Sequence, residues 1–555
     1  MSTVLLNTGK NSILTKQTEY NPFPGLRPFR QEESHLFFGR SGQSEEVIDK
    51  LSKNKFVAVI GASGSGKSSL LYCGVMPILH GGFVQGASSK WKIITTRPGG
   101  GPINNLAKAI VKSSNPNIKD DSELNESVAL NSAILRTSAN GLLDVAKNVP
   151  TEKGENILIL VDQFEELFRY KNNNKDQNGA NESVAFIKLL LNAVKNENSN
   201  VYVVMTMRSD FIGECAQFQE LTRLINESQY LIPRMSRQDM KEAIEGPISV
   251  GGGKISSRLV NQLLNEIGDN QDQLPILQHA LMRTWDYWTK FKSANEPIDN
   301  IHYESIGRME KALSEHANEA YDELTLRGKE ICLSIFKTLT ERGADNRGVR
   351  RPTKLSEIAK IALCEEKEVT EIYQNFRKKG RSFLTSADST LTSNSIIDVS
   401  HESLMRIWDR LIVWVEEEAN AVNMYLRISE AAALYQAGQT GLWRPPDLQL
   451  ALKWREQQKP TITWAQRHNL AFERTMSYLE ASEVAYIAEE KNKVKLQKKA
   501  LRRSRIFAIV VGTAAIFLSG VLVWAFQQKV EADKNLVLAK ENEVQAKANA
   551  KEPLG

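Results

Sequence analysis

The sequence predicts an α/β fold built on a parallel sheet, followed by helical domains and one transmembrane helix. Three observations support this. An apolar run at 56–60 leads through a Gly/Ser-rich loop into a helix-forming segment. A second apolar run at 157–161 ends in an aspartate. Far downstream, residues 506–526 are apolar and carry no charge. Strands alternating with helical segments are typical of parallel sheets, and long uncharged apolar runs are typical of membrane spans.

Residues 56–71 have the strand, loop and helix of a P-loop, in the pattern Gly-x-x-x-x-Gly-Lys-Ser. Small loop residues let backbone N–H groups turn inward around phosphate oxygens, and the helix N-terminus adds partial positive charge. The lysine reaches the β- and γ-phosphates, and the serine after it offers a hydroxyl to Mg²⁺. A Gly/Ser-rich surface loop is the weaker alternative. The predicted phosphate-binding residues are Gly61, Ser63, Gly64, Ser65, Gly66, Lys67, Ser68 and Ser69, with Ser68 also a metal ligand.

The run at 157–161 ends in Asp162, and Glu165 and Glu166 lie just beyond it. In P-loop folds we expect this strand beside the P-loop strand. Its terminal aspartate would hold Mg²⁺, directly or through water, while a nearby carboxylate polarises the attacking water. Both glutamates also fit the solvated start of a helix, so at most one is expected to be catalytic.

Two further apolar runs extend the predicted sheet. Residues 91–96 are the candidate intervening strand, followed by the turn RPGG. Residues 201–207 form another strand that ends in Arg208. A basic residue at that strand end would face the γ-phosphate, and we count it among the candidate catalytic residues. The alternative is a surface salt bridge.

Composition sets broad limits. The chain has 555 residues, of which 41% are hydrophobic and 25% charged, so we expect three or four ordinary globular domains. A net charge of +5 is too small to imply direct nucleic-acid binding. The four cysteines are scattered without metal-ligand spacing and indicate reduced thiols. The first residues lack the pattern of a signal peptide.

Residues 506–526 predict a single membrane span, because a helix of that length matches a hydrocarbon core of roughly 30 Å. The basic run at 491–505 before it predicts that the N-terminal side lies in the cytoplasm. We read this run as a topology and lipid anchor. A buried core helix is the alternative, which the polar neighbours on both sides make weaker.

In their order, these motifs resemble the novel STAND NTPases, prokaryotic signal-transduction ATPases with numerous domains. The resemblance rests on NPFPGLRPF at 21–29, HLFFGR at 35–40, the P-loop, VDQFEELF, VVMTMRSDF, QLPILQHAL at 273–281 and DVSHESLMRIW at 398–408. It covers about residues 20–485. The resemblance implies an AAA+/STAND-like core that binds ATP or ADP with Mg²⁺, and the preference for adenine over guanine rests on it alone.

The resemblance also implies a domain order. We expect a flexible tail at 1–20, the NTPase core at 21–235, a helical lid at 236–330, a winged-helix domain at 331–425, a helical module at 426–486, a basic juxtamembrane helix at 487–505, the transmembrane helix at 506–526 and a charged tail at 527–555. Within the winged-helix domain, the predicted helices are 329–342, 354–363 and 368–378, with a hairpin at 382–400.

Carried over residue by residue, the resemblance assigns further nucleotide contacts. Phe38, Gly39 and Arg40 would pack on the adenosine, Pro275 would touch the base, and His401 would contact the β-phosphate of ADP. The alternative for His401 is that Ser400 caps a helix and leaves the histidine exposed in its first turn. Gln163 stands where the broader family has glycine after the strand-ending aspartate.

STAND proteins usually carry an effector domain and a repeat sensor. The 20 N-terminal residues are too few for an effector, and no repeat is detectable after 486. We therefore expect either a fragment, which the abrupt ending KEPLG favours, or a separate sensor or effector partner.

The function implied is a signalling switch anchored in the cytoplasmic membrane, with stress or defence signalling as its expected setting. ADP would hold a closed monomer, ATP would drive opening and homo-oligomerisation, and slow regulatory hydrolysis would reset it. One alternative is an AAA+-like mechanical remodelling ATPase, for which no pore-loop segment is identified. The other is a membrane scaffold in which nucleotide is only structural.

Overall fold

The computed structural model describes residues 20–82, 90–118, 120–168, 177–268, 273–293, 295–343, 348–386, 388 and 390–549. The chain divides into two compact units, Met1–Ala419 and Asn420–Gly555, which are described in turn. All of the predicted N-terminal tail except Tyr20, and the terminal KEPLG, lie outside the described residues.

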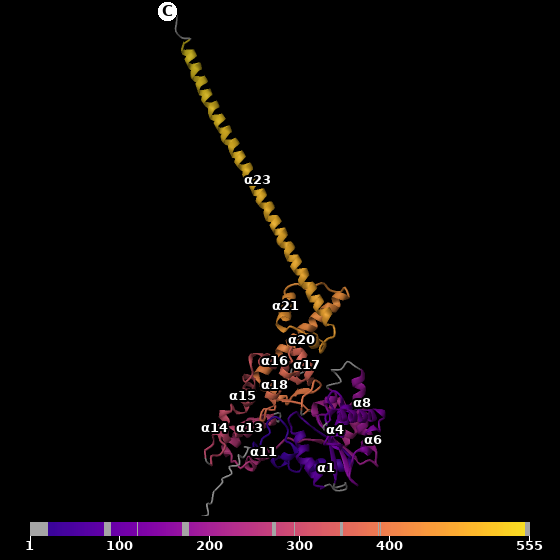
Figure 1. Ribbon diagram of the computed structural model, residues 1–555. Helices are drawn as coiled ribbons and strands as arrows, with labels where there is room; N and C mark the ends of the chain where they lie inside the picture. The colour runs from indigo at the N-terminus through magenta and orange to yellow at the C-terminus, as the bar shows by residue number, and fades with distance from the viewer. Residues whose placement is uncertain are drawn as a thin grey trace, which may run out of the picture. The chain divides into compact units, whose positions relative to one another are not determined.

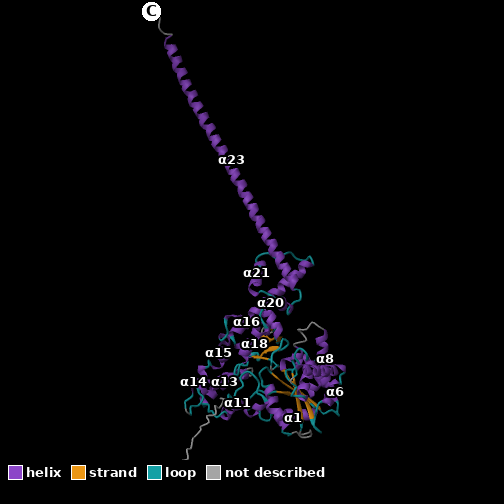
Figure 2. Cartoon of the chain, in the orientation of Figure 1, coloured by secondary structure: helices purple, strands orange, loops and turns teal. Residues whose placement is uncertain are grey.

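The first unit contains a five-stranded parallel sheet, drawn in orange in Figure 2. Its strands are β1 (Phe56–Gly61), β2 (Trp91–Thr96), β3 (Asn156–Val161), β4 (Val201–Arg208) and β5 (Gln229–Leu231). The parallel α/β core is therefore confirmed, and so is the strand predicted at 91–96.

The strand order β2-β3-β4-β1-β5 corrects one prediction. The strand ending before Asp162 does not lie beside the P-loop strand, because β4 is inserted between them. The reason is topological, since sequence order does not fix which parallel strands pair. The insertion brings the end of β4, which carries Arg208, directly beside the P-loop.

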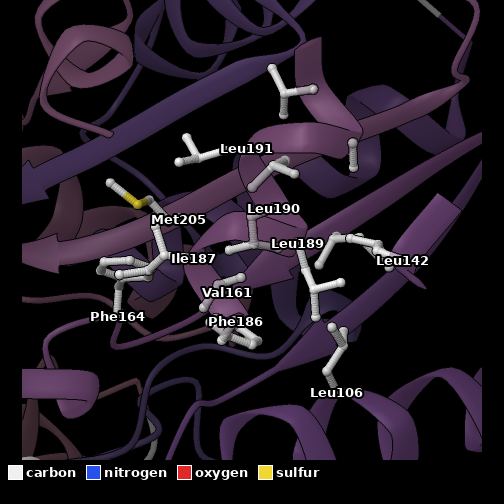
Figure 3. Close-up of a cluster of buried hydrophobic side chains, with 14 of the residues drawn as sticks. Leu106, Leu142, Val161, Phe164, Phe186, Ile187, Leu189, Leu190, Leu191 and Met205 are labelled. Carbon is white, nitrogen blue, oxygen red and sulfur yellow. The ribbon is translucent and has the colours of Figure 1, made fainter. Parts of the chain in front are cut away.

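Helices cover both faces of the sheet, which explains why its central strands are continuous apolar runs. Alternate residues of β3 point to opposite faces: Ile159 and Val161 join one core cluster, whereas Leu158 and Leu160 join the other. Figure 3 shows Leu189, Leu190 and other side chains of the first cluster gathered around Val161. The helices of that face are α4 (Pro102–Ser114), α5 (Asp121–Thr137), α6 (Gly141–Asn148), α8 (Gln177–Lys195) and α10 (Gln219–Glu227).

The other face is covered by α1 (Gln43–Asn54) and by the helix that follows the P-loop. That helix is not uniform. It begins as α2 (Lys67–Ser69), passes through a π-helical turn η2 (Leu70–Val75) and continues as α3 (Met76–His80). Single π turns inside helices occur frequently at functional sites. Short turns η1 (Gln31–Leu36), η3 (Ser209–Phe211) and α9 (Ile212–Cys215) complete this part.

Five helices follow the sheet: α11 (Arg237–Val250), α12 (Ser257–Ile267), α13 (Leu274–Phe291), α14 (Asn300–Ser305) and α15 (Arg308–Asp322). They share a core of their own, to which Phe23 of the N-terminal segment belongs. In Figure 1, α11, α13, α14 and α15 lie together beside the α/β part.

The rest of the first unit packs around another core, which takes Leu26 from the N-terminal segment. Its helices are α16 (Leu326–Leu339), α17 (Leu355–Ala362), α18 (Glu366–Arg377) and α19 (Ser403–Ile407). Its strands are β6 (Thr340–Arg342) with β7 (Gly348–Arg350), and β8 (Thr353–Lys354), β10 (Ile396–Val399) and β9 (Leu384–Thr385) in a second small sheet. The first helix begins and ends three residues earlier than predicted, and residues 340–342, which were placed in it, pair as the strand β6. The winged-helix assignment and the domain limits stay predictions.

The second unit is helical. α20 (Asp409–Gln436) leads into it, and α21 (Asp447–Gln458) and α22 (Ile462–Gln466) precede α23 (Phe472–Asn549). The predicted basic segment, the apolar segment and the tail as far as Asn549 are parts of this one continuous helix (Figure 1). Within the described residues, α23 alone is long and apolar enough to cross a membrane, judged by length and composition. Its most apolar stretch has a mean hydropathy of 2.6 and no buried residues. This stretch is therefore not buried in the core of the unit, unlike Tyr478 and Leu479 near the start of the same helix, and the membrane span stays a prediction.

Candidate functional site

A cavity of about 290 Å³ lies at the carboxyl edge of the parallel sheet. Its walls come from the P-loop, the ends of β2 and β4, the first turns of α13, and the segment between β10 and α19. Of the residues predicted from sequence, the lining includes Phe38, Arg40, Ser63, Gly64, Ser65, Gly66, Lys67, Ser68, Ser69, Glu165, Arg208, Pro275 and His401.

The P-loop has the backbone that its glycines allow. Gly64 and Gly66 have φ of 75° and 89°, in the left-handed region that favours glycine. The Lys67 ammonium donates to the carbonyl oxygens of Gly61 (3.0 Å) and Ala62 (2.6 Å). Burial lowers the pKa of Lys67, so an anion in the cavity would stabilise its charged form.

Asp162 is fully buried and accepts several hydrogen bonds. The hydroxyls of Ser68 and Thr206 each donate to its Oδ1 at 2.8 Å, and the Tyr72 hydroxyl donates to its Oδ2 at 3.2 Å. Burial alone would raise the pKa of Asp162, but Arg97 and these donors hold it below its usual value. The two predicted metal ligands, Ser68 and Asp162, therefore lie in direct contact.

Gln163 has a φ of 60°, uncommon for a residue other than glycine. This is the position where the broader family pattern has glycine. The Gln163 N–H donates to Thr206 Oγ1 at 2.8 Å, which helps to hold the backbone in this conformation. The left-handed conformation is thus kept although the glycine is not.

The two candidate glutamates have different surroundings. Glu165 is buried, lines the cavity and accepts the Arg208 N–H at 3.4 Å. Glu166 does not line the cavity, and it accepts the Gly99 N–H at 2.9 Å instead. Burial raises the pKa of Glu166 to about 7, against the opposing effect of Arg97. Geometry therefore favours Glu165 for any role on a ligand in the cavity.

The Arg208 guanidinium makes two ion pairs. It contacts Asp210 at 2.7 Å and Glu402 at 2.5 Å. Asp210 is a neighbour in sequence, whereas Glu402 comes from the segment between β10 and α19. Arg208 therefore does form a salt bridge, which was the alternative to a catalytic role. Its pair with Glu402 is largely buried, however, and joins two separately packed cores.

His401 is half-buried and lines the same cavity. Its Nδ1 accepts the Ser403 backbone N–H at 3.1 Å. A backbone N–H can only donate, so the neutral ring carries its proton on Nε2 and can donate from there. Burial, followed by the charge of Arg350, lowers the pKa of His401 to about 4. Glu402 rather than Ser400 is the N-cap of α19, which contradicts the cap arrangement considered for Ser400.

The segment 38–40 braces the P-loop. Phe38 packs against Gly246, where an added Cβ would lie 2.5 Å from its ring. Gly39 has a φ of 78°, and a Cβ there would meet the Asp239 carbonyl oxygen at 2.3 Å, so only glycine fits. The Arg40 guanidinium donates to the Ser65 carbonyl oxygen at 2.8 Å and to the Pro233 carbonyl oxygen at 2.8 Å. Phe38 and Arg40 line the cavity, whereas Gly39 fixes the backbone behind it.

Apolar side chains line much of the cavity near α13. Pro275 and Leu274 begin that helix, and Phe29 and Phe37 form an edge-to-face pair with centroids 6.1 Å apart. The Phe29 N–H donates to Ser69 Oγ at 3.3 Å, which ties the N-terminal segment to the P-loop helix. An apolar wall facing a phosphate-type loop suits a molecule with a flat base and an anionic tail.

Buried polar atoms in the cavity lining indicate which kind of ligand the site can hold. Among the described residues that line the cavity, four have a buried nitrogen or oxygen without a hydrogen-bond partner: Ser65 Oγ, Gln278 Nε2, Arg350 Nε and Ser400 Oγ. Buried polar groups are normally paired, and a ligand with several acceptors would satisfy such a set. Lys67, Arg97, Arg208 and Arg350 add positive charge to the lining. The residues present therefore fit a phosphate-bearing ligand.

Sequence reasoning missed several lining residues, among them the polar residues Arg97, Gln278, Arg350 and Glu402. Arg97 directly follows the strand β2 and could have been predicted, because parallel strands bring their carboxyl ends to one edge of the sheet. Glu402 adjoins the motif histidine, so attention to its charge would have found it. Arg350 lies on the small strand β7 and Gln278 on α13, and no local signal in the sequence marks either one.

Comparison with known proteins agrees with this site. A model of the family described as Novel STAND NTPase 1 matches residues 22–441. No curated protein matches the chain.

Three solved structures illustrate the similarity at low identity. The Aeropyrum pernix ORC1 protein in complex with DNA is 13% identical, with a TM-score of 0.37 over 69% of this chain and 92% of that chain. The Walker-type ATPase of Pyrococcus abyssi is 12% identical, with a TM-score of 0.34 over 69% and 98%. The RuvB Holliday junction branch migration motor of Thermotoga maritima is 15% identical, with a TM-score of 0.30 over 67% and 95%.

Proposed function

This chain belongs to the novel STAND NTPase family, and on that premise we propose that it is a membrane-anchored switch controlled by ADP and ATP. One observation carries the proposal. A single cavity takes its lining from three separately packed cores: the parallel sheet with the P-loop, the helical group containing α13, and the group containing β10 and α19. A ligand held there would join all three, and its exchange would change how they pack.

Individual roles follow from position. Lys67 and the P-loop N–H groups would bind the β- and γ-phosphates, and Ser68 with Asp162 would hold Mg²⁺. Bound Mg²⁺ neutralises phosphate charge during transfer. Pro275 and Phe38 would contact the adenosine. His401 would donate its Nε2–H to the β-phosphate of ADP, a role consistent with its tautomer.

Slow hydrolysis of ATP would return the switch to its ADP form. Glu165 is the better-placed candidate to polarise the attacking water, because it lines the cavity. Arg208 would stabilise the charge that develops on the γ-phosphate. Steady, fast turnover would instead favour a mechanical remodelling ATPase, and no turnover would favour a scaffold with structural nucleotide.

The two nucleotide states must differ in affinity for the closed form if exchange is to shift the population. The Arg208–Glu402 pair offers a source of that difference. A γ-phosphate is a competing anion for Arg208, so ATP would weaken a contact that ADP leaves intact. Release of the segment carrying His401 and Glu402 would then open the protein and allow assembly into homo-oligomers, with a separate sensor or effector partner supplying the stimulus.

Lys67→Ala is expected to weaken nucleotide binding at least tenfold, because charge-assisted contacts to phosphate are the strong ones. Isothermal titration with ATP and ADP measures it. Lys92→Ala is the matched control, since Lys92 lies outside the cavity on the edge strand β2 and donates to the Pro150 carbonyl oxygen at 2.8 Å. Equal affinities in the Lys67 variant and its parent would rule out the P-loop as the binding site.

The membrane proposal predicts that residues 1–505 lie in the cytoplasm, because of the basic run at 491–505. Protease added to intact spheroplasts should clip only the segment after 526 and leave the NTPase part whole. Digestion of the NTPase part would indicate the opposite topology. Recovery of the whole chain in the soluble fraction without detergent would contradict the membrane anchor.

A further inference from the structure

Arg97 holds the carboxylate that the proposed function reserves for a metal. It follows β2 at the carboxyl edge of the sheet and lines the cavity. Its Nη2 and Nε donate to Asp162 Oδ2 at 2.9 and 3.2 Å. The Arg97 side chain is 45% exposed, whereas that of Asp162 is fully buried. The pair thus places a movable cation against a buried anion.

Asp162 has little capacity left for a metal in this arrangement. Oδ1 already accepts from Ser68 and Thr206, and Oδ2 accepts from Tyr72 as well as from Arg97. Compact hydroxyl donors that fix a carboxylate's position are compatible with a metal ligand. A guanidinium paired with the carboxylate is not compatible with a metal there, because it neutralises the negative charge of Asp162 that would attract the metal ion.

Among these donors, Arg97 is the one able to leave. Thr206 is buried in the central strand β4, and Ser68 and Tyr72 belong to the P-loop helix, so their positions are fixed by packing. Arg97 has a long side chain that is already partly in the open cavity. The same cavity is lined by Lys67 and Arg208, the residues expected to face phosphate.

We propose that Arg97 is an internal counter-ion, which neutralises Asp162 while the site holds no metal and turns to the nucleotide phosphates when Mg²⁺ takes its place. This proposal rests on the proposed function, because the phosphates and the Mg²⁺ are those of the bound nucleotide. Arg97 is then a positioning residue for the metal and a phosphate ligand afterwards. Arg97 would thus link metal entry to phosphate binding. Neither the Asp162 carboxylate nor the Arg97 guanidinium would then be left unpaired in the site.

The proposal predicts a change in metal affinity whose sign separates it from a structural role. Mn²⁺ replaces Mg²⁺ at carboxylate sites and is detected by electron paramagnetic resonance. With saturating ADP, Arg97→Gln should bind Mn²⁺ at least tenfold more tightly than the parent, a gain of about 1.4 kcal/mol. The reason is that losing the counter-ion of a buried carboxylate costs the metal-free form more than losing one phosphate contact costs the metal-bound form.

Two variants serve as controls. Arg97→Lys keeps the charge and should remain within threefold of the parent. Arg136→Gln removes an arginine that pairs with Glu182 at 2.8 Å outside the cavity, and it should leave Mn²⁺ affinity unchanged. Unchanged or weaker Mn²⁺ binding in Arg97→Gln would overturn the proposal and leave Arg97 a structural partner of Asp162.

Thermal unfolding covers the case in which Arg97→Gln folds poorly. Without metal, the unfolding midpoint of Arg97→Gln should lie below that of the parent. Adding Mg²⁺ with ADP to both proteins should remove most of this difference, because the metal supplies the missing positive charge. A deficit that persists with Mg²⁺ and ADP would contradict the proposal. If the parent itself binds no Mg²⁺–nucleotide, the proposed function fails as well; if the parent binds it, only the role of Arg97 is in question.

Discussion

Glu165→Gln should slow single-turnover ATP hydrolysis by about a hundredfold or more while leaving Mg²⁺–ATP binding within threefold of the parent. Positioned general bases contribute roughly 10²–10⁴ in rate, and the amide cannot accept the proton of the attacking water. Glu165 is the acid of the pair that lines the cavity. Rapid-quench measurement with excess enzyme isolates the chemical step from product release.

Glu166→Gln is the matched comparison, with its effect expected on stability instead. In the parent, the pKa of Glu166 rises from 4.5 to about 7 on folding. The folded state therefore binds an extra proton between these pH values, and the free energy of unfolding falls as the pH rises through them. The glutamine amide does not titrate, so the variant does not lose stability in this way. The free energy of unfolding should therefore increase by about 2–3 kcal/mol more at pH 8 than at pH 4.5.

These two substitutions separate the roles of the neighbouring acids. If Glu166→Gln abolishes hydrolysis and Glu165→Gln does not, the assignment of the base is reversed. If neither slows single-turnover hydrolysis in a protein that hydrolyses ATP, the base lies elsewhere.

His401→Ala is expected to speed ADP release by about ten- to a hundredfold. Losing one polar contact to a charged group costs roughly 1.5–3 kcal/mol, which converts to that range of rates when the contact is absent in the transition state for release. The variant should also form larger assemblies in ATP without a stimulus. Displacement of a fluorescent ADP analogue and sedimentation velocity measure the two effects.

His468→Ala is the control, because it changes a histidine of the second unit that packs on Trp464. An ADP release rate and a sedimentation profile in His401→Ala that match the parent would remove His401 from the switch. The contact that holds the closed form would then have to be sought elsewhere, for example at Glu402.

The parallel core was predictable because its signals are local. The P-loop glycines, the apolar strands and Asp162 occur in short continuous segments, where backbone conformation and burial depend on adjacent residues. The pairing of β1 with β4 was not predictable from those segments, since it depends on which strands meet after long helical crossovers.

Much of the site lies beyond local reasoning. The ion pair of Arg208 with Glu402 joins residues that are 194 positions apart, and Arg350 reaches the same cavity from a short strand. The different surroundings of Glu165 and Glu166 are also invisible in sequence, because both follow the same strand. Only the turn of the chain after Asp162 sends one to the cavity and the other to Gly99.

The nucleotide carried by the protein tests the central claim most directly. The chain should be purified in detergent without added ligand, denatured, and its released small molecules quantified by chromatography and mass spectrometry. A cavity closed by three separately packed cores should retain about one ADP per chain, and Lys67→Ala should retain little. Protein that carries no nucleotide, and that binds neither ADP nor ATP in titration, would contradict the account.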